Sequence, residues 1–166
     1  MSNPQPMAKD EPEKIVLSHI AEHGWHCTHV VEDNGCPPWS FTIGLYETWD
    51  HPELIIIGRS RATSYEILKT LADDIELNDP PNLLSPDGQV LLGMKCHFVR
   101  VDTRYYSDYV GFALWFYRKR QFPLYQIIWP NREGLYPWEA DAPKPFKEWQ
   151  PILGETLDRD SGPVER

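Results

Sequence analysis

Cysteine is scarce in this sequence, and the scarcity excludes a small protein held together by disulfide bonds. There are only three cysteines, Cys27, Cys36 and Cys96, and no two of them stand in a CxxC spacing. An odd number of scattered thiols is typical of a reducing compartment. We therefore expect a cytoplasmic protein whose cysteines are reduced.

Long apolar runs are also missing. The first residues, MSNPQPMAKDEPEK, are polar and acidic, and no apolar segment follows them as it would in a signal peptide. No later stretch approaches the roughly 20 apolar residues of a membrane-spanning helix. The sequence therefore predicts no membrane partner.

Positive charge is in deficit, with 16 Lys and Arg against 25 Asp and Glu and a formal net charge of −9. The clearest basic run, RKRQ at 118–121, closes a predicted helix, where cations complement the helix dipole. A negative average field repels a phosphate backbone. We expect no nucleic-acid partner, and a basic protein or a small ligand fits the charge better.

The short motifs of common enzymes are absent. The sequence has no GxSxG elbow, no glycine-rich phosphate loop and no HExxH zinc pattern. It therefore indicates no particular cofactor, and a catalytic role would have to come from residues outside these motifs.

The residues that are present predict one folded domain. Hydrophobic residues make up 41% of the 166 positions and aromatic residues 13%, which is enough for a packed core. We place a single domain at 11–155. The polar ends, 1–10 and 156–166, are expected to be flexible tails.

The pattern of apolar residues predicts an α+β fold. Helical spacing indicates helices at 10–24, 63–77 and 107–120. β-branched and aromatic runs between turn residues indicate strands at 25–33, 39–46, 51–59, 89–93, 95–102 and 123–129. Strands in groups with inserted helices favour a mostly antiparallel twisted sheet of about six strands with about three helices.

Histidines crowd into SHIAEHGWHCTH, residues 18–29. His19 and His23 are four apart on the first predicted helix, which is a spacing that lets two imidazoles share one metal ion. No zinc spacing accompanies them, so we predict no metal site, with these two as the candidates if one exists. The alternative is a histidine-rich helix end that is stabilised by the helix dipole.

The segment DHPE, residues 50–53, is the best candidate for acid–base chemistry. Pro52 holds the preceding residue extended, so His51 and Glu53 can share one face at the start of a strand. An imidazole beside a carboxylate can act as a general base with its support, and it can equally form a salt bridge at a strand end.

The stretch QIIWPNREGLYPWE, residues 126–139, is the best candidate for a binding surface. Asn131 and Gly134 suit a turn, which puts Trp129 and Trp138 on opposite limbs of a loop. Aromatic residues beside polar ones resemble a ligand-binding or protein-binding hot spot. The predicted binding residues are Thr42, Gln126, Trp129, Asn131, Arg132 and Trp138. The alternative is a small aromatic core that closes one edge of the sheet.

Three segments in this order, EHGWH, FTIGLYETWDHPELIIIG and QIIWPNREGLYPWE, resemble a bacterial family known as domain of unknown function 4262. The resemblance spans roughly residues 15–140 and implies a small bacterial cytoplasmic protein without implying an activity. Asn131 stands where an acidic residue is common in that family. The matching motif residues are Gly24, Trp25, Thr42, Gly44, Leu45, His51, Pro52, Glu53, Gln126, Trp129, Pro130, Gly134, Pro137 and Trp138.

Two function classes follow. The first is a binding module for a protein partner or small ligand, one version being a neutraliser of a basic toxin or enzyme, because acidic charge speeds association with a basic protein. The second is a small enzyme that uses His51 and Glu53, with Gln126 orienting substrate and a metal-bound histidine as an optional assistant. A flavin-binding barrel has only the aromatic content in its favour, since no phosphate-binding signature is present.

Overall fold

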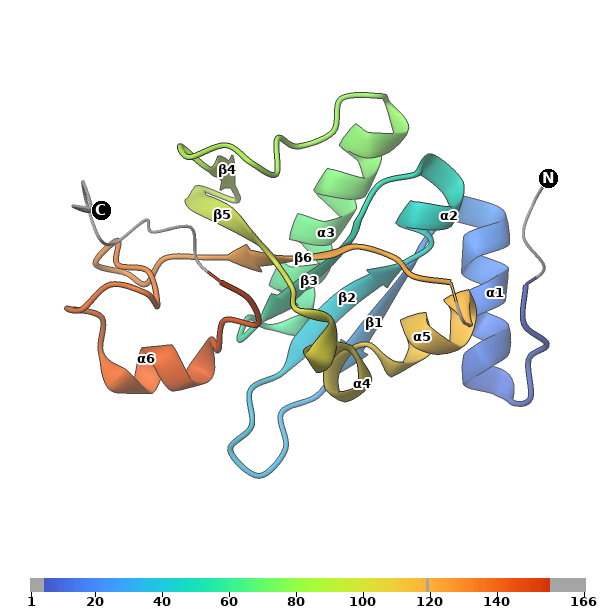
Figure 1. Ribbon diagram of the computed structural model, residues 1–166, viewed down its shortest axis with the longest axis horizontal. Helices are drawn as coiled ribbons and strands as arrows, with labels where there is room; N and C mark the ends of the chain where they lie inside the picture. The colour runs from blue at the N-terminus through green and yellow to red at the C-terminus, as the bar shows by residue number, and fades with distance from the viewer. Residues whose placement is uncertain (1–4, 119, 156–166) are drawn as a thin grey trace.

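A six-stranded sheet forms the centre of the protein in the computed structural model, which describes residues 5–118 and 120–155 (Figure 1). The strand order is β1-β2-β3-β6-β5-β4. β3 and β6 run parallel, and the other neighbours are antiparallel. The predicted α+β fold with a mostly antiparallel sheet is therefore confirmed. The strands are β1 (His26–Val30), β2 (Trp39–Ile43), β3 (Glu53–Ile57), β4 (Gln89–Leu91), β5 (Met94–Arg100) and β6 (Leu124–Ile128).

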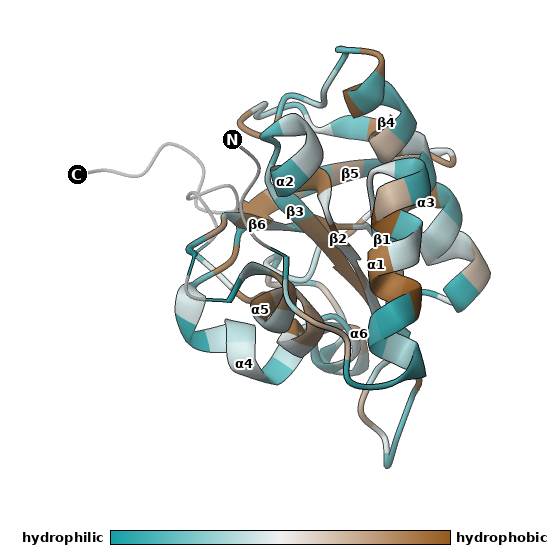
Figure 2. Cartoon of the chain, turned by 90° about the vertical axis from the view of Figure 1, so that its right-hand side faces the viewer, coloured by the Kyte–Doolittle hydropathy of each residue, from teal (hydrophilic) through white to brown (hydrophobic). Residues whose placement is uncertain are grey.

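Helices cover both faces of the sheet. One face packs against α1, α4 and α5 through residues that include Val16, Ile20, Ala113 and Phe116, and the other packs against α3. Figure 2 shows the apolar strands β2 and β3 in the interior between these helices. The helices are α1 (Glu11–His23), α2 (Leu45–Trp49), α3 (Arg61–Glu76), α4 (Tyr106–Tyr109), α5 (Gly111–Tyr117) and α6 (Lys144–Trp149), with a 3₁₀ turn η1 (Thr103–Tyr105) before α4.

The two long helices begin at side-chain caps. The carboxylate of Asp10 accepts a hydrogen bond from the backbone N–H of Glu13, and the hydroxyl of Ser60 accepts one from Thr63. α1 ends at Gly24, whose φ of 88° is the left-handed conformation that glycine adopts without strain. The helix predicted at 63–77 therefore starts two residues earlier than expected, at Arg61, directly after its Ser60 cap.

The structure corrects the predicted elements in three places. The strand expected at 39–46 ends at Ile43, and the short helix α2 follows it. The helix expected at 107–120 is broken at Val110 into α4 and α5. The helix α6 was not predicted. Pro143 is its N-cap, and Pro145 lies in its first turn.

Strand β3 is the most buried part of the sheet. All five of its residues have no exposed surface, which is typical of a strand that is buried on both faces. It lies between β2 and β6, so any polar group on β3 must find partners inside the protein. Glu53 is that polar group.

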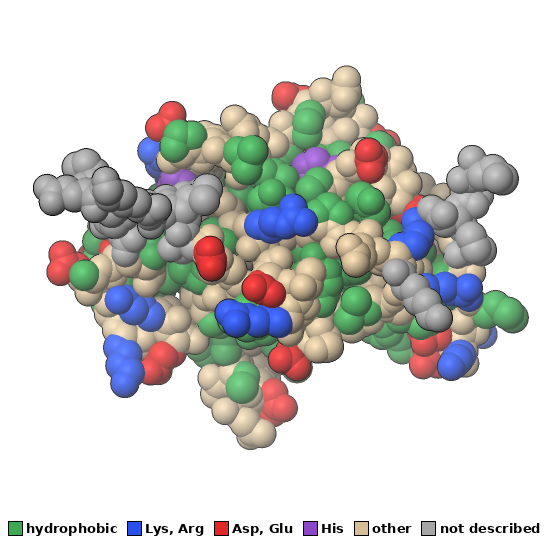
Figure 3. All heavy atoms as spheres, viewed as in Figure 1, with side chains coloured by type: hydrophobic (Ala, Val, Ile, Leu, Met, Phe, Trp, Pro, Cys, Tyr) green, Lys and Arg blue, Asp and Glu red, His purple; other side chains and the backbone are tan. Residues whose placement is uncertain are grey.

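The surface carries both signs of charge. On the face shown in Figure 3, acidic and basic side chains are interspersed. Among the described residues no helix is both long and apolar enough to cross a membrane. Of the predicted tails, residues 1–4 and 156–166 lie outside the described ranges.

Candidate functional site

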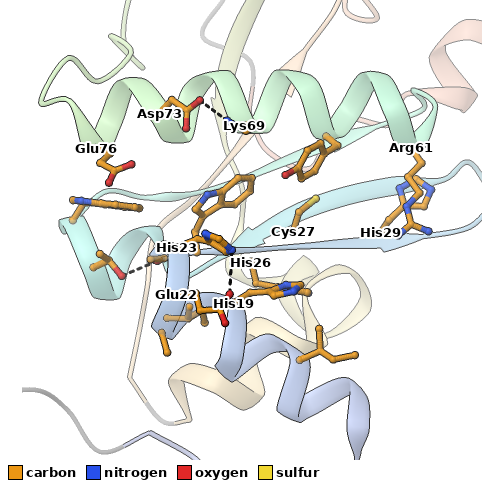
Figure 4. Close-up of a pocket in the computed structure, with 18 of the residues that line it drawn as sticks. His19, Glu22, His23, His26, Cys27, His29, Arg61, Lys69, Asp73 and Glu76 are labelled. Carbon is orange, nitrogen blue, oxygen red and sulfur yellow. Dashed lines mark hydrogen bonds and ion pairs between the residues drawn. The ribbon is translucent and has the colours of Figure 1, made fainter.

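A groove of about 1320 Å³ runs along β1, the strand at one edge of the sheet (Figure 4). Its floor is formed by Trp25, His26, Cys27 and His29, and its two walls by α1 and α3. Thr48 and Trp49 of α2 also line it. The groove therefore combines a sheet edge, two helix flanks and a helix end in one concave surface.

Side chains of the floor alternate between the two walls, as they must on a strand. Trp25 stacks on Tyr65 of α3 with ring centroids 6.2 Å apart. His26 points the other way and stacks on His19 of α1 at 5.0 Å. The groove thus has an aromatic wall on the α3 side and an imidazole wall on the α1 side.

The imidazole wall is polar with little charge. Nδ1 of His19 lies 2.8 Å from Nδ1 of His26, so one ring donates a hydrogen bond and the other accepts it as a neutral imidazole. Burial, and then the neighbouring His19, lower the pKa of His26 to about 4. At neutral pH the floor therefore presents an uncharged His26 ring.

The metal candidates from the sequence lie at this wall without forming a full ligand set. The rings of His19 and His23 are 6.2 Å apart and tilted, whereas the direct contact of His19 is with His26. Over the described residues, no group of three or more His, Cys, Asp or Glu side chains is arranged to hold a metal ion.

The charged groups of the groove are separated along its length. Arg61 lies beside His29 at the start of α3, and Glu76 lies at the other end of that helix, with Glu22 of α1 also on this side (Figure 4). Between them Lys69 forms an ion pair with Asp73 at 2.7 Å. Burial, and then the charge of Arg61, lower the pKa of His29. One end of the groove is therefore cationic and the other acidic.

Cys27 lies in the floor between the walls. Burial raises the pKa of its thiol to about 11, against a smaller opposing effect of Arg61. At neutral pH the group is a protonated thiol, which is a weak nucleophile. Cys27 thus contributes a small apolar surface to the groove.

Away from the groove, Glu53 is the centre of a fully buried hydrogen-bond network. Its carboxylate accepts hydrogen bonds from the Thr42 hydroxyl at 2.7 Å and from the Tyr117 hydroxyl. It also accepts from the backbone N–H groups at the start of α2, those of Gly44, Leu45 and Tyr46, at 2.9, 3.2 and 3.3 Å. We call this set of residues, Glu53, Thr42, Tyr117 and the first turn of α2, the Glu53 hub.

Burial raises the pKa of Glu53, and the hydroxyl and backbone donors oppose that rise. Burial and the adjacent Glu53 also raise the pKa of Tyr117. Five donors fill the lone pairs of the carboxylate, which stabilises its charged form without contact with water. The chemistry of this geometry is that of an internal helix cap.

His51 lies two residues before Glu53, and its ring bonds to a different partner. Its Nδ1 is 2.8 Å from the carbonyl oxygen of Pro52, and its side chain is almost completely buried. Burial lowers the pKa of His51, with a smaller opposite effect of that carbonyl. The two proposed acid–base residues thus use their polar atoms on different partners, and the acid–base hypothesis stays a prediction.

Three of the predicted binding residues are buried and bonded inside the protein. Thr42 belongs to the Glu53 hub. The Gln126 side chain donates to Pro151 O and accepts from Leu153 N, each at 2.8 Å, and so fastens the C-terminal segment to β6. Trp129 donates to Ile57 O at 2.8 Å, and its ring meets that of Phe146 at 5.2 Å.

The other three lie beyond the end of β6. The side-chain oxygen of Asn131 accepts from Glu133 N and Leu135 N, which fixes the turn. Arg132 is exposed, and Trp138 stacks on Tyr136 at 4.8 Å. The structure therefore divides the six predicted residues between interior and surface, and their role in binding stays a prediction.

Sequence reasoning missed the α3 wall. Arg61, Tyr65, Lys69, Asp73 and Glu76 recur three or four residues apart, which is the spacing of one helix face. That polar stripe was a usable signal. The position of β1 at the edge was not, because strand order depends on contacts distant in sequence.

Comparisons with known proteins give one match. A family model described as Domain of unknown function (DUF4262) matches residues 19–143, which include β1, the Glu53 hub and the turn after β6. No curated protein and no solved structure matches the chain. Because the family model covers most of its length, the chain belongs to the family Domain of unknown function (DUF4262).

Proposed function

We propose that this protein is a binding module whose site is the groove between α1 and α3, and that its occupant is a protein partner or a small ligand. The observation that carries the proposal is the groove itself, about 1320 Å³ in volume and lined by side chains that face solvent. Tyr65 and Ile15, on opposite walls, are 47% and 45% exposed, so both can bury apolar surface against an occupant.

The Glu53 hub supports binding over catalysis. A general base must reach a substrate proton, and Glu53 has no exposed surface and five internal donors. Nothing in the geometry of His51 favours the enzyme alternative. The groove, by contrast, offers aromatic, polar and charged groups without a paired nucleophile and base.

The kind of partner and the cellular location are part of the same proposal. A net charge of −9 supports a basic partner, such as a toxin or enzyme that this protein neutralises. The three free cysteines, Cys27, Cys36 and Cys96, support a reducing, cytoplasmic location, and the family resemblance supports a bacterial one.

The test fills the groove with one side chain. Ala62 is exposed and lines the groove, so the Ala62→Trp variant should obstruct it without disturbing the core. Thr70, exposed on α3 and outside the groove, gives the matched control Thr70→Trp. Wild type and both variants are used as baits in extracts of the cells that express the protein, and captured proteins are quantified by mass spectrometry.

We expect Ala62→Trp to lower capture of the specific partner by about tenfold or more, which corresponds to ~1.4 kcal/mol. Thr70→Trp should leave capture unchanged. A small ligand would be seen instead as a bound mass in native mass spectrometry that Ala62→Trp removes. Equal capture and equal bound mass for both variants would contradict the groove as the site.

A further inference from the structure

The floor of the groove is an unpaired sheet edge. β1 pairs with β2 on one side, and no other described strand pairs with it on the other. Natural edge strands are usually protected by lysine, proline or a bulge. The five residues His26–Val30, with the sequence HCTHV, contain neither lysine nor proline, and all pair in continuous register with β2. This edge can accept a further strand.

The walls match the side chains of such a strand. Successive residues of a strand point to opposite sides, so an added strand would face α3 and α1 in turn. On the α3 side it would meet Tyr65, and on the α1 side Ile15 and His19. Because Tyr65 and Ile15 are each about half exposed, both can bury apolar surface against the added strand.

The charges at the two ends of the groove determine which charged group of the bound strand lies at each end. Glu22 and Glu76 lie at the end near His23, and Arg61 lies at the end near His29 (Figure 4). Lys69 and Asp73 neutralise each other between them, and Arg61 has no ion pair within residues 5–118 and 120–155. A strand with a basic group at one end and a carboxylate at the other complements this pattern.

We propose that the occupant is an extended segment of a partner protein that adds to β1 as an additional strand. Its basic side chain lies at the Glu22–Glu76 end and its carboxylate at Arg61. Arg61 and Glu76 stand at the two ends of α3, about 22 Å apart at a rise of about 1.5 Å per residue. Since each residue of a strand advances about 3.3 Å, the two charges are about six or seven residues apart. This inference rests on the proposed function, because it specifies what the same groove binds.

The first experiment selects peptides from a random linear octapeptide library displayed on phage. Selection is on the wild-type protein, with counter-selection on Ala62→Trp to remove sequences that bind elsewhere. We expect enriched sequences to place Lys or Arg and Asp or Glu about six or seven residues apart, with β-branched or aromatic residues between them. Enrichment without that charge pattern, or no enrichment over Ala62→Trp, would overturn the inference.

The second experiment reverses the lone cationic end. Arg61→Glu should weaken binding of a selected synthetic peptide by about tenfold or more, and replacing the peptide's acidic residue by lysine should restore it. Arg104→Glu makes the same change in net charge at an exposed site outside the groove and should leave affinity unchanged. Equal weakening by both variants would show that only net charge matters.

The third experiment tests strand pairing itself. Methylating single backbone amides of the peptide should weaken binding about tenfold or more at every second position, because alternate N–H groups face β1. Uniform tolerance of methylation would exclude strand addition. If Ala62→Trp still removes the cellular partner in that case, the binding module stands and only its strand-like occupant is wrong. If Ala62→Trp leaves the partner bound, the proposed function itself fails.

Discussion

Around Glu53 the polar atoms turn inward, each to an internal partner, whereas along β1 the polar side chains of α1 and α3 turn outward to solvent. The first region contains several of the distinctive motif residues, including Thr42, Gly44 and Glu53, and it holds two strands and a helix together. The second is built from Arg61, Tyr65 and their neighbours on α3. The contrast teaches that a distinctive sequence motif can stabilise the interior of the fold, while the accessible groove is built from residues that belong to no recognisable motif.

The largest effect that would break this comparison concerns Glu53. Glu53→Ala leaves three backbone N–H groups and two hydroxyls without their acceptor inside the core. We expect the free energy of unfolding to fall by about 3–5 kcal/mol, measured by urea denaturation. Glu66→Ala, at an exposed position of α3, is the control. A fall of less than about 1 kcal/mol for Glu53→Ala would mean that the hub does not stabilise the fold.

The next effect concerns Gln126, which tests whether the late motif is also structural. Gln126→Ala removes the bonds to Pro151 O and Leu153 N and leaves a cavity in the core. We expect a loss of about 2–3 kcal/mol and faster proteolysis at the C-terminal segment. Gln121→Ala, at an exposed site, should change neither. Intact stability with lost binding would instead restore Gln126 as a ligand residue.

A smaller effect links the groove to pH. The folded state lowers the pKa of His26 from 6.5 to about 4, so the unfolded chain binds the proton more tightly. The stability that this neutral ring contributes is complete above about pH 6.5 and is lost as the pH falls through about 4. After discounting for partial exposure, we expect about 1–2 kcal/mol.

The measurement is urea unfolding of the wild type and His26→Gln across this range of pH. The stability advantage of the wild type, taken as the difference between the two curves, should shrink as the pH falls. A constant difference would show that neither burial nor the neighbouring His19 lowers the pKa of His26.

The smallest expected effect is on the stability of groove variants, and it tests whether the groove, unlike the Glu53 hub, contributes little to the stability of the fold. Arg61→Ala and Ala62→Trp change exposed side chains, so each should alter the free energy of unfolding by no more than about 0.5 kcal/mol. Thermal unfolding with circular dichroism checks this. A large loss in either variant would place the α3 wall among the structural parts of the protein.

Much of the fold could be predicted because local signals agree with it. Runs of β-branched and aromatic residues located all six strands, and helical periodicity located α1 and α3. The short helix α2 could not be predicted, because its first N–H groups are satisfied by Glu53, whose partnership depends on the folded sheet. The parallel pairing of β3 with β6 is likewise a property of the tertiary structure.

The site was harder to predict than the fold. The segment 126–139 was predicted as the binding surface because of its aromatic residues and prolines. In the structure, Trp129 of this segment donates to Ile57 O and is almost fully buried. The groove depends on which strand lies at the edge and on two helices that flank it, and neither property has a local sequence pattern. His19 was singled out for a pairing with His23, and its closest partner is His26.

The parallel pair β3–β6 has a consequence for how the chain assembles. β1 to β3 form a local meander and β4 with β5 form a hairpin, whereas residues 58–123 separate β3 from β6. Contacts that close a long loop form late, because the chain loses the conformational entropy of the loop before the contacts that compensate for this loss are made. We expect the most buried seam of the sheet to close last. During synthesis, β3 therefore waits with an open inner edge until residue 124 and its successors leave the ribosome.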